Sequence, residues 1–316
     1  MLKLGKHASM TTIAALSVTA VSMAQAQDFT LSTGSQGGSW YPIGGALKAV
    51  VEDKLDDVSI TVTPGSGLAN VQGVANGRFP IAFANSISTV DGINGRDPFN
   101  EAIDNVCNLG TLYPQYFQVM ALDDAEVGSV ADFEGKRLTT QQNGHTGEML
   151  TRGLLDTNGL SYDDLDSVSH LSYSDSVVAM KDGHADIFTL GTALPAGSVM
   201  DLANSRDISF VPIDDATFDQ FKEQNAAFQK RMVHAGSYPG VDEDVPAITY
   251  DTHMIAQCDF DDEIVTAFLE AVVENTDSLG DISRAMKDLT PKEMATDIGV
   301  PLHPAAEAFY REHDAL

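Results

Sequence analysis

Short strand patterns and amphipathic helix patterns alternate along the first part of this 316-residue chain. Strand-like stretches occupy residues 28–33, 59–63 and 79–84, and helical spacing of apolar residues falls between them, at 45–55 and 70–76. Such alternation is typical of βαβ units, in which helices cover a mostly parallel sheet. The chain is therefore predicted to have an α/β fold.

The same alternation starts again after a long strand-like stretch at 109–123. The segments expected to follow are strands at 137–141, 166–172, 185–191 and 247–257 and helices at 148–158, 174–182, 217–232, 262–275 and 291–298. Two α/β units joined by extended strands, with a helical tail, predict two lobes and a cleft between them.

The N-terminal 26 residues have the order of features found in a secretory signal peptide. Lys3 and Lys6 precede an apolar run at 10–24. Ala24-Gln25-Ala26 then matches the A-x-A pattern of small residues at which signal peptides are cleaved. The apolar run is shorter than the roughly 20 residues that a spanning helix needs. We expect residues 1–26 to be removed near Ala26 and the mature protein to be exported.

Acidic residues far outnumber basic ones. The formal net charge is −28, and loss of the signal peptide would remove two lysines and no acid. A polyanion needs lysine and arginine to displace its counterions, so the charge argues against nucleic acid as a partner.

The sequence contains two cysteines, Cys107 and Cys258, each in a strand-like context. In an oxidising compartment they can pair, and a bridge across so long a loop would stabilise the fold by about 5 kcal/mol. Two buried free thiols are an equally open interpretation.

A glycine-rich loop at 34–45 follows the first strand and carries Ser39, Trp40 and Tyr41. Glycines allow a backbone to approach a ligand closely, and an aromatic residue can pack on it. The alternative is a packed turn in which Trp40, the single tryptophan, fills the core.

Residues 65–70 (GSGLAN) end a strand and open a helix. The stretch departs from a dinucleotide-binding loop because Asn70 stands where a third glycine or alanine belongs. Free N–H groups at the start of a helix bind a carboxylate well, with Ser66 nearby. Simple capping of the helix by Ser66 is the competing interpretation.

A second polar loop at 142–147 contains Asn143, His145 and Thr146. Recognisable catalytic motifs are absent from the sequence: there is no G-x-S-x-G elbow, no H-E-x-x-H and no P-loop lysine. We therefore expect a binding protein without metal or cofactor. The competing hypothesis is a hydrolase that uses Ser66 and His145 across the cleft.

Four stretches together resemble the TAXI family, the extracytoplasmic solute receptors of TRAP (tripartite ATP-independent periplasmic) transporters. They are STGSQGGSWYPIGGAL, TPGSGLANVQGVANGRFPIAFAN, LYPQYFQVMALDDAEVGSVADFEGKRLTT and VPLHPAAEAFYRE. They are spread over nearly the whole mature chain. One departure lies at 143–146, where the family often has Gly-Ser-Gly-Thr.

The resemblance implies a type II periplasmic-binding fold, with residues 27–122 plus 250–316 in one lobe and 123–249 in the other. It also implies a periplasmic monomer that delivers a glutamate-, glutamine- or 2-oxoglutarate-like anion to an ion-coupled membrane permease. A sensor subunit for a signalling partner is the other role that fits. The expected ligand-binding residues are Ser39, Trp40, Tyr41, Ser66, Asn70, Asn85, Gln141, Asn143, His145, Thr146, Thr189 and Thr192.

Overall fold

The computed structural model describes residues 27–316 and, before them, Met1 alone. The predicted signal peptide at 1–26, apart from Met1, therefore lies outside the described residues. Within the described part of the chain, no helix combines the length and apolar character needed to cross a membrane.

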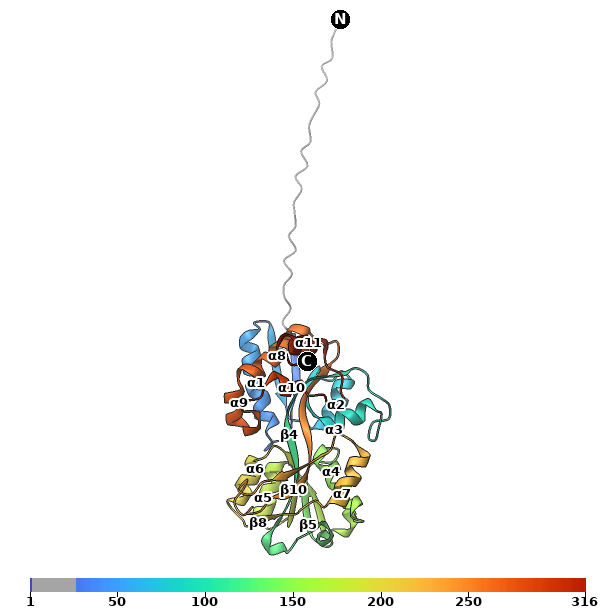
Figure 1. Ribbon diagram of the computed structural model, residues 1–316, viewed down its shortest axis with the longest axis vertical. Coiled ribbons are helices and arrows are strands. Elements are labelled where there is room, and N and C mark those ends of the chain that lie inside the picture. Colours follow the sequence, from blue (N-terminus) through green and yellow to red (C-terminus); the bar gives the residue numbers. More distant parts are fainter. Residues whose placement is uncertain (2–26) are drawn as a thin grey trace.

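Lobe 1 forms the upper part of Figure 1 and begins with three parallel strands in the order β2–β1–β3. The strands are β1 (Gln27–Ser32), β2 (Val58–Thr63) and β3 (Ile81–Asn85). The helices are α1 (Trp40–Lys54), α2 (Gly67–Ala75), α3 (Ser86–Ile93), α8 (Asp262–Glu274), α9 (Thr276–Ile282), α10 (Pro291–Met294) and α11 (Pro304–Glu312). The predicted βαβ arrangement of residues 28–84 is thus confirmed.

Lobe 2 forms the lower part of Figure 1 and repeats the design, with β6, β5 and β7 side by side. Its strands are β5 (Arg137–Thr140), β6 (Ser167–His170), β7 (Ile187–Thr192), β8 (Ile208–Phe210) and β9 (Gln229–Val233). Its helices are α4 (Thr146–Thr157), α5 (Tyr173–Lys181), α6 (Gly197–Ala203) and α7 (Asp215–Gln224). Short 3₁₀ helices lie at Asp123–Ala125, Val130–Phe133, Tyr162–Asp164 and Arg284–Met286.

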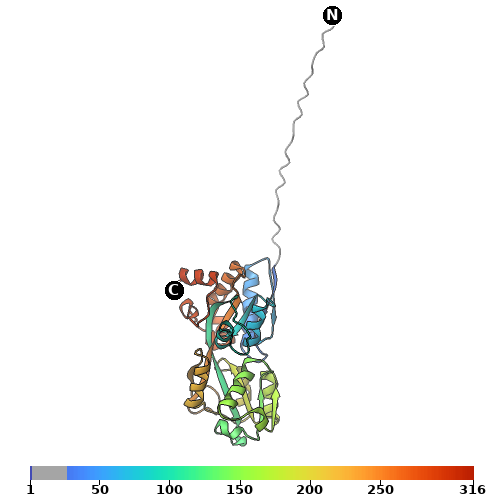
Figure 2. The same ribbon diagram turned by 90° about the vertical axis from the view of Figure 1, so that its right-hand side faces the viewer.

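Two long antiparallel strands, β4 (Val106–Leu122) and β10 (Val245–Gln257), run through both lobes (Figures 1 and 2). In lobe 1, β10 pairs with β3, and in lobe 2, β4 pairs with β7 and β8. We propose that the boundaries expected at 122/123 and 249/250 lie within these two strands, because each strand contributes pairs to both lobes.

Each lobe has its own apolar core. In lobe 1, Leu31, Phe83 and Phe268 are fully buried in one cluster, and in lobe 2, Phe133 and Leu154 are fully buried in another. Separate cores allow each lobe to move as a unit about the crossing strands.

The helix predicted at 217–232 is wrong in its second half. The helix α7 ends at Gln224, because Asn225 has an extended backbone with φ −147° and ψ 114°. Residues 229–233 then pair antiparallel with β10 as β9. Tertiary pairing at a sheet edge overrides the local helical spacing here. The helix predicted at 291–298 is also shorter and ends at Met294.

Cys107 and Cys258 form a disulfide that joins the first residues of β4 to the chain just after β10. The pairing register explains it, because Ala256 lies opposite Cys107 on the neighbouring strand. Of the two interpretations of these cysteines, the bridge is the one that the structure shows.

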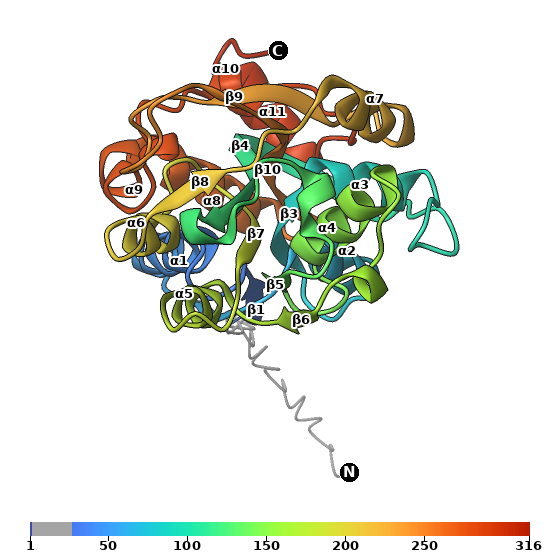
Figure 3. The ribbon, with the colours of Figure 1, turned by 90° about the horizontal axis from the view of Figure 1, so that it is seen from below.

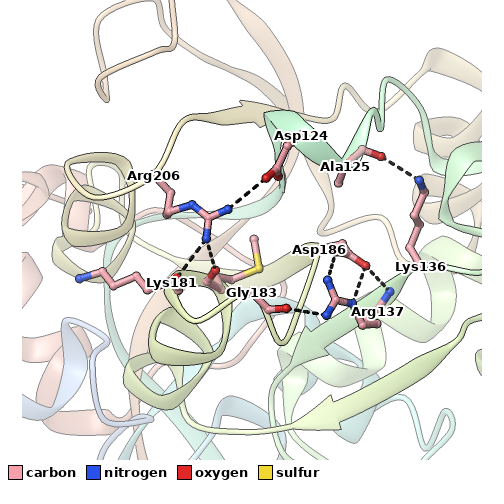
Figure 4. A network of polar contacts seen from close by, with 9 residues as sticks. Asp124, Ala125, Lys136, Arg137, Lys181, Gly183, Asp186 and Arg206 are labelled. Carbon is pink, nitrogen blue, oxygen red and sulfur yellow. Dashed lines mark hydrogen bonds and ion pairs between the residues drawn. The ribbon is translucent and has the colours of Figure 1, made fainter.

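Several of the scarce basic residues join neighbouring segments of lobe 2 through polar contacts (Figure 4). Arg206 donates to the Lys181 carbonyl at the end of α5 (3.0 Å) and pairs with Asp124 (3.3 Å). Arg137 pairs with Asp186, and this contact lowers the pKa of the Asp186 carboxyl. Cations at the C-terminal end of a helix complement its dipole, so these arginines have a structural role.

Candidate functional site

A cavity lies between the lobes, at the carboxyl ends of the parallel strands. Lobe 1, the crossing strands and lobe 2 all contribute to its wall. The lining residues are Gly34, Ser35, Gly38, Ser39, Trp40, Ser66, Gly67, Asn85, Gln115, Gln141, Thr146, Tyr173, Gly191, Thr192 and Tyr250. Open α/β sheets bind ligands at this edge, because loops and helix starts gather there.

Five helices begin at the cavity. Its wall includes the N-cap or first residue of each of them: Ser39 and Trp40 for α1, Ser66 and Gly67 for α2, Asn85 for α3, Thr146 for α4 and Tyr173 for α5. The first turn of a helix has free N–H groups and the positive end of the dipole. Their convergence makes the cavity attractive to an anion although no charged side chain is among the described residues that line it.

The polar side chains of the wall are amides and hydroxyls. Asn85 is 3% exposed, and its Oδ1 has no hydrogen-bond partner among the described residues. Burial raises the pKa of the Tyr173 and Tyr250 hydroxyls, so both stay neutral. An unpaired buried amide is costly, and a ligand that pairs with Asn85 would remove that penalty.

The two lobes touch directly across the cavity. The Leu68 N–H group in the first turn of α2 donates to Thr146 Oγ1 of lobe 2 (3.2 Å). Gly37, at φ +87°, brings the first loop against α5: a Cβ atom there would lie 2.7 Å from Ser174 Oγ. The cavity between the lobes has a volume of about 30 Å³. Direct contacts thus join the two lobes beside the cavity, an arrangement that we call the closed form.

Seven of the residues expected from sequence line the cavity: Ser39, Trp40, Ser66, Asn85, Gln141, Thr146 and Thr192. Trp40 also meets the alternative expectation, because it is 6% exposed and stacks on Phe83 at 5.8 Å between ring centroids. Its Nε1 donates to Thr252 Oγ1 (3.2 Å), so the indole forms both a wall of the cavity and part of the core of lobe 1.

The other five expected residues do not line the cavity. Asn70 is buried and ties α2 to the sheet by donating to the Thr33 and Phe83 carbonyls (2.7 and 2.8 Å). Thr189 bonds Thr151 inside lobe 2 (2.7 Å). Tyr41 is 39% exposed and Asn143 is exposed, while His145 is the N-cap residue of α4.

Sequence reasoning missed Gln115, Tyr173 and Tyr250 as lining residues. Tyr173 is the first residue of α5, the position that Trp40 occupies in α1, so the strand-to-helix junction would have indicated it. Gln115 interrupts the apolar β4, where its Nε2 donates to Thr252 Oγ1 (2.7 Å). Nothing in the local sequence distinguishes Tyr250 from the other residues of β10.

We expect anion affinity to be the same from pH 6.5 to 8. Burial lowers the pKa of His145, and the nearby Glu148 carboxylate offsets this only in part. The lowered pKa favours the neutral imidazole over this range, so we expect it to supply no charge. Calorimetric titration of wild type and His145→Gln with glutamate, glutamine and 2-oxoglutarate checks this. Affinity that falls as pH rises, in wild type only, would show that protonated His145 takes part.

Comparison with known protein families matches residues 31–313 to the NMT1-like family. The chain belongs to the NMT1-like family. The NMT1-like family is of the periplasmic solute-binding type. Together with the sheet order and the two crossing strands, this membership confirms the predicted two-lobed α/β fold.

Solved structures similar to this NMT1-like chain share little sequence with it. A protein from Bordetella bronchiseptica RB50 is 16% identical, with a TM-score of 0.50 over 81% of this chain and 75% of its own. A TctC solute-binding protein from Polaromonas is 14% identical, with a TM-score of 0.48 over 93% and 100%. The periplasmic aliphatic sulphonate-binding protein SsuA from Escherichia coli is 14% identical, with a TM-score of 0.46 over 90% and 78%. At these identities the likeness concerns the fold alone.

Proposed function

We propose that this protein is an extracytoplasmic solute-binding protein that holds a small organic anion between its lobes. The observation that carries the proposal is the meeting of five helix N-termini at one interlobe cavity. The NMT1-like family is of the periplasmic solute-binding type. The basic, apolar and small-residue segments of the first 26 residues support export of the chain.

Neutral donors are sufficient to hold such an anion. The side chains of Ser66, Asn85 and Gln141 line the same space, together with the first residues of α2 and α4. Each hydrogen bond to a charged group contributes about 1.5–3 kcal/mol, so three or four near the upper end of that range supply the roughly 8 kcal/mol of micromolar affinity. Closure of the lobes strengthens them by excluding water.

The resemblance to TAXI receptors supports a finer proposal about ligand and partner. We infer that the anion is glutamate-, glutamine- or 2-oxoglutarate-like and that the closed protein delivers it to an ion-coupled permease of the TRAP type.

A hydrolase that uses Ser66 and His145 gains no support from the geometry. Ser66 Oγ accepts the Ala69 N–H at 3.5 Å as a helix cap, and His145 does not line the cavity. The two side chains form no hydrogen bond with each other. A nucleophile needs its base within hydrogen-bond reach, so binding without turnover is the function proposed.

Trp40 provides a direct test of this proposal, because it is the single tryptophan and lies in the cavity wall. We expect its emission to shift when a carboxylate ligand is added to protein stripped of ligand by unfolding and refolding. Mass spectrometry of the small molecules released on unfolding identifies the natural ligand. An unchanged spectrum, with no organic anion released and no binding of the three test carboxylates, would contradict the proposed function.

A further inference from the structure

Helix α3 belongs to lobe 1 but also contacts lobe 2, and the view from below shows its label near those of α4 and α7 (Figure 3). Its Ile87 side chain is 2% exposed and lies in the core cluster of lobe 2, with Leu150, Phe221 and Phe228. An isoleucine from one lobe is thus buried among the apolar residues of the other.

Polar contacts surround this isoleucine. Asn225, which follows α7 and is 2% exposed, donates through Nδ2 to the Ile87 carbonyl (3.0 Å) and to Asp91 Oδ1 (2.9 Å). Its Oδ1 accepts the Ala227 N–H (2.9 Å). This bond orients the amide so that Nδ2 faces lobe 1.

Arg96, in the loop after α3, completes the contact. Its Nε lies 2.9 Å from Asp91 Oδ1, and its Nη1 donates to the Gln224 carbonyl of lobe 2 (3.1 Å). We call Ile87, Asp91, Arg96 and Asn225 the α3 clasp. Burial raises the pKa of Asp91, whereas Arg96 and Asn225 favour its charged form, so the carboxylate depends on these partners.

The same helix reaches the binding cavity. Its N-cap residue is Asn85, two positions before Ile87, and Asn85 lines the cavity. Thr89 bonds the neutral, buried His253 on β10 (2.8 Å), so α3 is held firmly to the sheet. A displacement of α3 relative to lobe 2 therefore moves Asn85 relative to Thr146 and Gln141.

A wide groove borders the clasp. All four clasp residues line it, and its volume is about 1000 Å³. Water can therefore replace the clasp hydrogen bonds when the lobes separate, which makes the contact reversible.

We propose that the α3 clasp forms when the lobes close, holds the closed form together and positions Asn85 for the ligand. The clasp residues are positioning residues that do not touch the ligand. This inference rests on the proposed function, because it concerns the regulation of the same site. When a ligand binds only the closed form, its apparent affinity falls as the open fraction of the protein rises.

Asn225→Ala tests the clasp without any ligand. We expect its radius of gyration in X-ray scattering to exceed that of ligand-free wild type, and the amide N–H groups of α3 to exchange about tenfold faster. Asn158→Ala is the matched control, since Asn158 donates to Leu154 and Thr217 within lobe 2. The control is expected to keep the wild-type radius and α3 exchange.

Arg96→Ala, at a partly exposed site, provides a second variant that does not disturb a core. It is expected to change the radius of gyration and the exchange of the α3 amides in the same direction as Asn225→Ala.

Titration with glutamate, glutamine and 2-oxoglutarate adds an affinity measurement. We expect Kd to rise about tenfold in Asn225→Ala and to stay unchanged in Asn158→Ala. If both clasp variants keep the wild-type radius and α3 exchange, the clasp proposal is wrong. If no test carboxylate binds wild type and unfolding releases no anion, the proposed function is wrong, whereas the scattering and exchange results still decide the clasp.

Discussion

Replacing Gly67 by alanine is expected to weaken anion binding tenfold to a hundredfold. Gly67 is the first residue of α2, and a Cβ there would lie 2.1 Å from Asn85 Nδ2 and 3.0 Å from Thr146 Oγ1. The Asn85 Cγ atom would lie 2.7 Å from the same Cβ, so the buried Asn85 side chain must turn as a whole and leave its place in the cavity. The loss of one or two hydrogen bonds to a charged ligand corresponds to this range of Kd.

Gly197→Ala is the matched control. Gly197 is likewise the first residue of a helix, α6, and a Cβ there meets no atom within 4 Å. Both substitutions have the same effect on the unfolded chain, so their difference reports the contacts at Gly67. Calorimetric Kd values and urea midpoints of wild type and both variants check the prediction. Equal Kd values for Gly67→Ala and Gly197→Ala would place the ligand elsewhere.

Loss of the Cys107–Cys258 disulfide is expected to reduce the free energy of unfolding by about 5 kcal/mol. The bridge joins residues 151 positions apart, and restricting so long a loop removes much of the entropy of the unfolded chain. Both cysteines lie at the lobe 1 ends of the crossing strands, away from the cavity, so ligand affinity should not change.

Urea unfolding of the Cys107→Ser/Cys258→Ser protein measures this effect. The midpoint of wild type should fall to that of the double variant when a reductant is added, and the variant should not respond to the reductant. If wild type and variant unfold at the same midpoint under oxidising conditions, the bridge contributes nothing to stability.

The sequence was most informative where local chemistry and tertiary structure agree. The alternation of apolar strands and helical spacing predicted both α/β units, because buried parallel strands and the helices that cover them require those patterns. The strand-to-helix loops contributed Ser39, Ser66 and Thr146 to the cavity, since a helix start after a strand lies at the ligand-binding edge of the sheet.

Other features depend on contacts between residues distant in the sequence. Residues 229–233 form β9 because the edge of β10 is available, and local spacing contains no sign of that edge. Asn70 looks like a ligand-binding residue in sequence, but its amide bonds two carbonyls of neighbouring strands. Ile87 enters the core of lobe 2 although it belongs to lobe 1, and only the closed arrangement of the lobes shows this.

The central claim is that an organic anion lies in the cavity where five helices begin. Native mass spectrometry of wild type, Gly67→Ala and Gly197→Ala, purified in the same way, tests it most directly. The account predicts one small organic anion per chain on wild type and Gly197→Ala, and a reduced or absent anion on Gly67→Ala. Equal occupancy of all three proteins, or a bound molecule with no negative charge, would contradict the account.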